Sequence, residues 1–127
     1  MEDKDFEIVF YESQDGKSQI WDFLEDLRRK SRTSKDARVQ YNQVSLYIRL
    51  LSKNGTNMNE AITKHLDENI WKLRPGNNRV FYFFAQKDTF VLLHQFRKKS
   101  QKTPRRELDR AKKERNDYLF RKEHGLK

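Results

Sequence analysis

Across residues 70–103 the chain has three runs of mostly hydrophobic residues, in which successive side chains point to alternate faces with the two-residue period of β-strands. The pattern predicts three successive strands joined by two tight turns. Centring the turns on Gly76-Asn77 and on Lys87-Asp88 fixes which residues of neighbouring strands lie opposite each other. The predicted pairs are Ile70 with Phe83, Lys72 with Phe81, Arg74 with Arg79, Phe83 with Leu92, Phe81 with His94, and Arg79 with Phe96.

Both faces of these strands are apolar, so both faces of the sheet need a covering layer. The first predicted face consists of Trp71, Leu73, Val80, Tyr82, Phe84, Val91 and Leu93. The second consists of Ile70, Phe81, Phe83, Phe90 and Leu92. Lys72, Arg74, Arg79 and His94 share the second face by the same alternation, near one end of the sheet.

The segments before the strands supply one cover. Residues 6–11 predict a short first strand, and Ser18 is a plausible N-cap for a helix ending at Lys30, with apolar residues at helical spacing. A second amphipathic helix is predicted over 35–53, stopped by Gly55. We expect the two helices to form an antiparallel pair on one face. Residues 59–66 are interpreted as a short helical turn.

The C-terminal segment supplies the other cover. Thr103 is predicted to cap a helix that has Pro104 at its first position and runs to about residue 122. The predicted fold is α+β: a small, mainly antiparallel sheet with the N-terminal helix pair on one face and a basic C-terminal helix on the other. Residues 1–127 are expected to form a single domain, with residues 123–127 frayed.

Charge is distributed unevenly along the chain. The formal net charge is +9, but residues 1–69 hold 11 Lys/Arg against 13 Asp/Glu, whereas residues 70–127 hold 17 against 6. The excess positive charge therefore lies in the sheet and the C-terminal helix. Such one-sided charge is typical of a protein that binds a polyanion, usually nucleic acid. A basic helix exposed to solvent with no ligand is the alternative.

The sequence lacks the residues that several classes of chemistry require. With no cysteine, the chain has no disulfide, thiolate catalysis or cysteine-bound zinc, and its four glycines form no phosphate-binding loop. The three histidines are far apart in the sequence, so we expect neither a metal site nor a cofactor. No apolar run approaches twenty residues, so we expect a soluble, cytoplasmic protein with no membrane contact.

The cations themselves indicate a chemistry. Like charges placed opposite each other destabilise a sheet, so Arg74 and Arg79 make sense with an anion between them. Cleavage of RNA by its own 2′-hydroxyl needs charge stabilisation from arginines, together with an acid and a base such as a lysine of lowered pKa or His94. Alternatively, both arginines are solvated or paired with carboxylates, and His94 is a structural histidine.

The segments WKLRPGNNRVFYFF and TFVLLHQFRKKSQKTP, after a strand and two helices and before a basic helix, resemble the RelE/ParE toxin superfamily. Within it, the chain is similar to the HigB-type, phage Gp49-like branch. The resemblance implies a RelE-like fold and a toxin of a type II toxin–antitoxin system. It further implies a ribosome-dependent mRNA interferase, an endoribonuclease that needs no metal. The implied partners are messenger RNA, the ribosome and a helix-turn-helix, HigA-like antitoxin, through which operator DNA is bound.

The resemblance also assigns residues. Arg79 matches the family arginine at the scissile phosphate, and Lys98 and Lys99 fall where the family has a basic residue after the last long strand. The candidate catalytic residues are Arg74, Arg79, His94, Lys98 and Lys99. The candidate nucleic-acid-binding residues are Lys72, Arg97, Lys102, Arg105 and Arg106. The superfamily leaves open a ParE-like inhibitor of DNA gyrase, and the charge leaves open a non-catalytic nucleic-acid-binding module.

Overall fold

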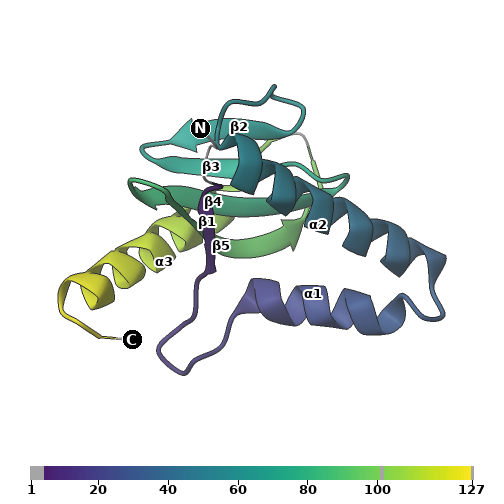
Figure 1. Ribbon diagram of the computed structural model, residues 1–127, viewed down its shortest axis with the longest axis horizontal. Coiled ribbons are helices and arrows are strands. Elements are labelled where there is room, and N and C mark those ends of the chain that lie inside the picture. Colours follow the sequence, from purple (N-terminus) through teal and green to yellow (C-terminus); the bar gives the residue numbers. More distant parts are fainter. Residues whose placement is uncertain (1–4, 101, 127) are drawn as a thin grey trace.

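A computed structural model describes residues 5–100 and 102–126. It contains three helices and a five-stranded sheet of order β1-β5-β4-β3-β2, in which only β1 runs parallel to its neighbour β5 (Figure 1). This α+β architecture confirms the predicted fold class. The elements are β1 (Glu7–Phe10), α1 (Gln19–Lys30), α2 (Lys35–Asn54), β2 (Thr63–Asp67), β3 (Ile70–Leu73), β4 (Asn78–Gln86), β5 (Thr89–Arg97) and α3 (Arg105–Glu123).

The helix pair covers one face of the sheet, as predicted. Ser18 and Ser34 accept hydrogen bonds from the first turns of α1 and α2, and Gly55 ends α2 with a φ of 60°. Because their apolar stripes face the sheet, the side chains between the two layers form a hydrophobic core. Its fully buried members are Ile20, Val44, Leu51, Leu73, Val80, Tyr82, Phe90 and Leu92.

Helix α3 covers the opposite face (Figure 1). The start predicted for it is wrong by one residue: Pro104 is the N-cap, and it makes no side-chain hydrogen bond to the first turn. The hydroxyl of Thr103, expected to cap α3, instead accepts a hydrogen bond from Lys72 Nζ. At the other end, the fraying predicted for residues 123–127 stays a prediction, and Lys127 lies outside the described residues.

The helical turn predicted over 59–66 is present only at its start, where the amides of Ile62 and Thr63 bond the carbonyl oxygen of Asn59, and residues 63–67 form strand β2 instead. The strand pairs antiparallel with β3 across a two-residue connection in which Glu68 has a φ of 52°. Glutamate rarely adopts this left-handed conformation, so the sequence has no glycine at the position where the turn requires a positive φ. The additional strand extends the sheet on the side of β3.

The register confirms four of the six predicted pairs and contradicts two, Arg74–Arg79, which lies outside the ladder, and Phe83–Leu92. Ile70–Phe83, Lys72–Phe81, Phe81–His94 and Arg79–Phe96 are observed, whereas Phe83 pairs with Val91 instead of Leu92. The register of β4 against β5 shifts between Phe81 and Tyr82. A one-residue shift exchanges the faces of a strand, so Val91 and Leu93 lie under α3, while Phe90 and Leu92 lie under the helix pair.

Within the described part of the chain, no helix combines the length and apolar character that crossing a membrane requires.

Candidate functional site

Lys72 is the centre of a group of cations on the α3 face of the sheet. Lys72 is only 8% exposed, and its Nζ donates a hydrogen bond to Thr103 Oγ1 at 3.1 Å. The residue directly opposite on β2 is Lys64, which is exposed. Strand β2, which the sequence did not predict, therefore places a second cation opposite Lys72. Like charges in directly opposed positions repel each other.

Arg79 lies at the start of β4, where the turn from β3 holds its side chain. The residue is 6% exposed, and Nη1 donates to the carbonyl oxygens of Gly76 and Asn78, both at 2.8 Å. The turn places Gly76 at a φ of 61°, which favours glycine. A Cβ there would lie 2.5 Å from the side chain of Gln43. The Pro-Gly-Asn sequence thus aims the Arg79 guanidinium at the end of the sheet.

Arg74 follows β3 directly. The β3–β4 pairing ends at Leu73 and Val80, so the predicted opposition of Arg74 and Arg79 is not part of the ladder. The backbone N–H of Arg74 instead bonds the carbonyl oxygen of Ile62, before β2, and its Nη1 donates to the carbonyl oxygen of Glu60 at 2.6 Å. Arg74 nevertheless remains close enough to both other cations to influence their ionisation.

Burial and mutual repulsion together alter the protonation of this group. Burial, followed by repulsion from Arg74 and Arg79, lowers the pKa of Lys72 to about 8, with smaller contributions from Lys64 and Lys98. Burial and then Arg74 also lower the pKa of Arg79. An anion placed here would relieve the repulsion, and near neutral pH a fraction of Lys72 is available to accept a proton.

The segment between β5 and α3 completes a small pocket around Lys72 and Arg79. Lys98 joins the end of the sheet, because its backbone N–H bonds the carbonyl oxygen of Asn77 at 2.7 Å. The pocket has about 10 Å³ of free space, so a phosphate group would sit at its mouth. None of its described lining residues is acidic. They are Lys72, Arg79, Phe96, Lys98, Lys99, Ser100, Lys102, Thr103 and Pro104. We call this the cation pocket.

Other predicted site residues lie elsewhere. His94 is fully buried between Glu107 and Glu114 of α3 and does not line the cation pocket. Arg97 bonds Gln40 of α2, on the opposite face of the sheet. Arg105 and Arg106 are exposed in the first turn of α3, where Arg105 pairs with Asp109 at 3.3 Å. The structure therefore brings together Lys72, Arg74, Arg79, Lys98, Lys99 and Lys102.

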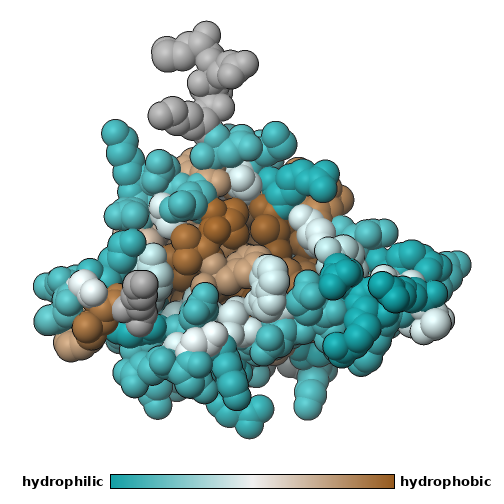
Figure 2. Space-filling view, turned by 60° about the horizontal axis from the view of Figure 1, so that its bottom comes forward, coloured by the Kyte–Doolittle hydropathy of each residue, from teal (hydrophilic) through white to brown (hydrophobic). Residues whose placement is uncertain are grey.

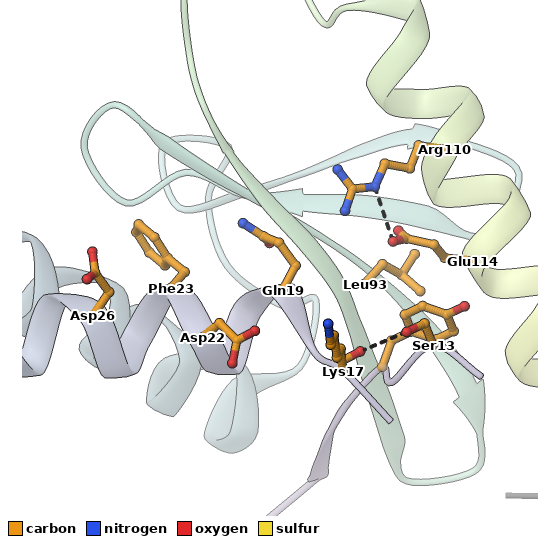
Figure 3. A pocket seen from close by; sticks show the side chains of 10 residues that line it. Ser13, Lys17, Gln19, Asp22, Phe23, Asp26, Leu93, Arg110 and Glu114 are labelled. Atoms are coloured by element: carbon orange, nitrogen blue, oxygen red, sulfur yellow. Dashed lines mark hydrogen bonds and ion pairs between the residues drawn. The ribbon is translucent and has the colours of Figure 1, made fainter. Parts of the chain in front are cut away.

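A separate hollow lies where β5 extends beyond the short strand β1. Side chains of α1 and α3 face each other across it, with Leu93 between them, in a volume of about 510 Å³ (Figure 3). Gln19 closes the exposed edge of β5 by accepting a hydrogen bond from the backbone of Gln95 at 2.6 Å. The rim of the hollow carries both signs of charge, unlike the cation pocket. In the view that brings the bottom of the molecule forward, hydrophobic side chains gather at the centre of the surface and hydrophilic ones surround them (Figure 2).

Residues 24–116 match the family model described as "Phage derived protein Gp49-like (DUF891)". No curated protein matches the chain. The matched residues extend from α1 into α3 and include every residue of the cation pocket.

Proposed function

The chain belongs to the phage-derived Gp49-like family, a RelE/HigB-like toxin family, and on that premise we propose that it is an mRNA interferase. In this proposal it is the HigB-type toxin of a type II toxin–antitoxin system and cleaves messenger RNA during translation on the ribosome. A toxin family implies an antitoxin partner. We propose a HigA-like antitoxin with a helix-turn-helix domain, which also carries the contact with operator DNA.

The observation that carries the proposal is that Lys72 and Arg79, which Arg74 repels from nearby, line a pocket whose described lining contains no carboxylate. Burying cations together costs free energy unless something offsets their repulsion. A phosphodiester offers that compensation, since its oxygens accept hydrogen bonds from both arginines and lysines. A ligand that merely needed an electropositive surface would be served by exposed lysines such as those of α3.

The chemistry we propose is an internal transesterification. The 2′-oxygen of the RNA forms a bond to the adjacent phosphorus as the bond to the 5′-oxygen breaks. Lys72, unprotonated in part because of its lowered pKa, accepts the proton of the 2′-hydroxyl. Arg74 and Arg79 stabilise the negative charge that develops on the phosphorane. Lys98 or Lys99 returns a proton to the leaving 5′-oxygen, so that the products end in a 2′,3′-cyclic phosphate and a 5′-hydroxyl.

Residues outside the cation pocket have supporting roles in this proposal. Lys102, Arg105 and Arg106 contact phosphates of the messenger or of ribosomal RNA, which gives binding a strong dependence on salt. Lys64, next to Lys72 on the exposed edge strand, adds a further phosphate contact. Neither a metal ion nor a cofactor has a step in this scheme.

The test is mapping of transcript ends in a host just after the chain is induced without antitoxin. The variant Arg79→Ala removes one phosphate contact, and Arg49→Ala, on the exposed side of α2, is the matched control. New 5′ ends inside translated frames, present for the wild type and the control but absent for Arg79→Ala, are expected. Intact messages with relaxed or broken DNA would indicate a gyrase inhibitor instead. Intact messages with normal growth would indicate a passive nucleic-acid-binding module.

A further inference from the structure

His94 is a fully buried histidine whose ring nitrogens both contact carboxylates of α3. Nδ1 lies 2.6 Å from Glu114 Oε1, and Nε2 lies 3.0 Å from Glu107 Oε1. The two carboxylates are themselves only 13% and 17% exposed. Both ring nitrogens therefore face carboxylate oxygens of α3, and neither is directed at the cation pocket.

The irregular pairing of β4 with β5 explains why His94 faces α3. The register shift between Phe81 and Tyr82 adds a residue to β5. As a result the consecutive residues Leu93 and His94 both point toward α3, one into the apolar cluster and one to the carboxylates. A regular strand would have turned one of the two toward the helix pair.

Helix α3 needs such a contact because it offers little apolar surface. Ala111 and Arg121 are its only buried residues within the described chain, and its N-cap makes no side-chain hydrogen bond to the first turn. Glu107 lies in that first turn. Its contact with His94 therefore adds to the apolar packing of Leu108 in fixing the start of the helix against the sheet.

The start of α3 is also one wall of the cation pocket. Glu107 lies four residues after Thr103, which accepts the hydrogen bond of Lys72, and Lys102 precedes both. We propose that His94, Glu107 and Glu114 form a buried clamp that positions the start of α3, and through it Thr103 and Lys102, over the cation pocket. In this view His94 is a positioning residue, not the group that transfers a proton. The inference rests on the proposed ribonuclease function of the pocket.

Three variants test the clamp in single-turnover cleavage of messenger RNA bound to programmed ribosomes. Glu107→Ala removes the carboxylate, whereas Glu107→Gln keeps an oxygen that accepts from His94. Asp109→Asn breaks the exposed pair with Arg105 in the same part of α3 and serves as the control. We expect Glu107→Ala to lower the rate about 10-fold or more, because small displacements of positioning groups are costly to a reaction. Glu107→Gln should recover most of that loss, and Asp109→Asn should cleave at the wild-type rate.

A double-mutant cycle shows whether the clamp acts through Thr103. If it does, combining Glu107→Ala with Thr103→Val lowers the rate little more than either change alone. Multiplicative losses would mean that Glu107 does not act through the Lys72–Thr103 contact. The clamp would also be wrong if neither glutamine nor any other hydrogen-bond acceptor at position 107 restored the cleavage rate.

Hydrogen exchange separates the clamp from the proposed function. The amide of Leu108 donates to the carbonyl oxygen of Pro104 at 3.2 Å and reports on the start of α3. It should exchange faster in Glu107→Ala than in the wild type and in Asp109→Asn. If the wild type cleaves no RNA, the proposed function fails while this exchange still tests the clamp. If the wild type cleaves and Glu107→Ala neither slows cleavage nor speeds exchange, the clamp itself is wrong.

Discussion

The face of the sheet under α1 and α2 differs from the face under α3 in what fills the space between helix and strand. Under the helix pair, Ile20, Val44 and Leu51 are 0% exposed and pack on an apolar surface. Under α3, apolar contacts give way toward one end of the sheet to buried Lys72, Arg79 and His94. Apolar burial stabilises a fold, whereas each buried cation costs free energy unless it is compensated.

This difference shows which face serves stability and which serves function. The helix pair packs on the sheet through apolar side chains, and none of the charged residues buried in the described chain lies between them. The α3 face holds repelling cations that a more stable protein would replace, which is typical of a functional site. Variants that act on one face and not on the other can therefore break or sharpen the contrast.

The largest effect is expected from Lys72→Met. Loss of the proposed base should lower single-turnover cleavage on the order of 10²- to 10⁴-fold. The same change removes a desolvated, repelled charge, so the free energy of unfolding at pH 7 should rise by roughly 1–3 kcal/mol. Urea denaturation measures the second quantity. A variant that cleaves normally, or that is less stable than the wild type, would contradict the assignment of Lys72.

On the other face, Leu51→Ala should act on stability alone. Truncating this fully buried side chain is expected to cost about 2–5 kcal/mol in urea denaturation. The control Leu46→Ala, on the same helix but 46% exposed, should change stability by about 0.5 kcal/mol or less. Equal losses for the two variants would show that the helix pair does not form the stabilising core.

The pKa of Lys72 also predicts how stability changes with pH. Between about pH 8 and the ordinary lysine value near 10.4, the unfolded chain binds a proton that the folded chain lacks. The free energy of unfolding attributable to this group therefore rises with pH across that window. Between pH 8 and 9.5 the wild type should gain roughly 1–2 kcal/mol relative to Lys72→Met. Parallel pH profiles would mean that Lys72 titrates as an ordinary exposed lysine.

The smallest effect is expected from Arg106→Ala, at an exposed residue of α3. Loss of one phosphate contact should reduce the slope of log affinity for RNA against log salt concentration by about 1. Stability should stay within about 0.5 kcal/mol of the wild type, because the side chain supports no packing. An unchanged slope would remove Arg106 from the RNA-binding surface.

Much of the fold could be predicted because its signals are local. The caps at Ser18 and Gly55, the helical spacing of α1 and α2 and the glycine turn before Asn78 each act over a few residues. The strand β2 was missed because its turn uses Glu68 in a conformation that glutamate rarely adopts. The exchanged faces of β5 follow from a register shift for which no residue type provides a marker.

The site was predictable in its cations but not in their arrangement. The register alone places Lys72 and Arg79 on one face near one end of the sheet. His94 has two partners, Glu107 and Glu114, which lie 13 and 20 residues further along the sequence. They become its neighbours only once α3 packs on the sheet. The sequence predicts only a local role for the hydroxyl of Thr103, as a helix cap. The tertiary fold brings Lys72 within hydrogen-bonding distance of it.

The central claim is that the cation pocket cleaves RNA, and purified protein tests it most directly. The measurement is the single-turnover rate of messenger RNA cleavage on programmed ribosomes for the wild type, Arg79→Ala and Arg49→Ala, with analysis of the product ends. We predict 2′,3′-cyclic phosphate and 5′-hydroxyl ends, wild-type rates for Arg49→Ala and a loss on the order of 10²- to 10³-fold for Arg79→Ala. Cleavage by folded Arg79→Ala at the wild-type rate would contradict the account.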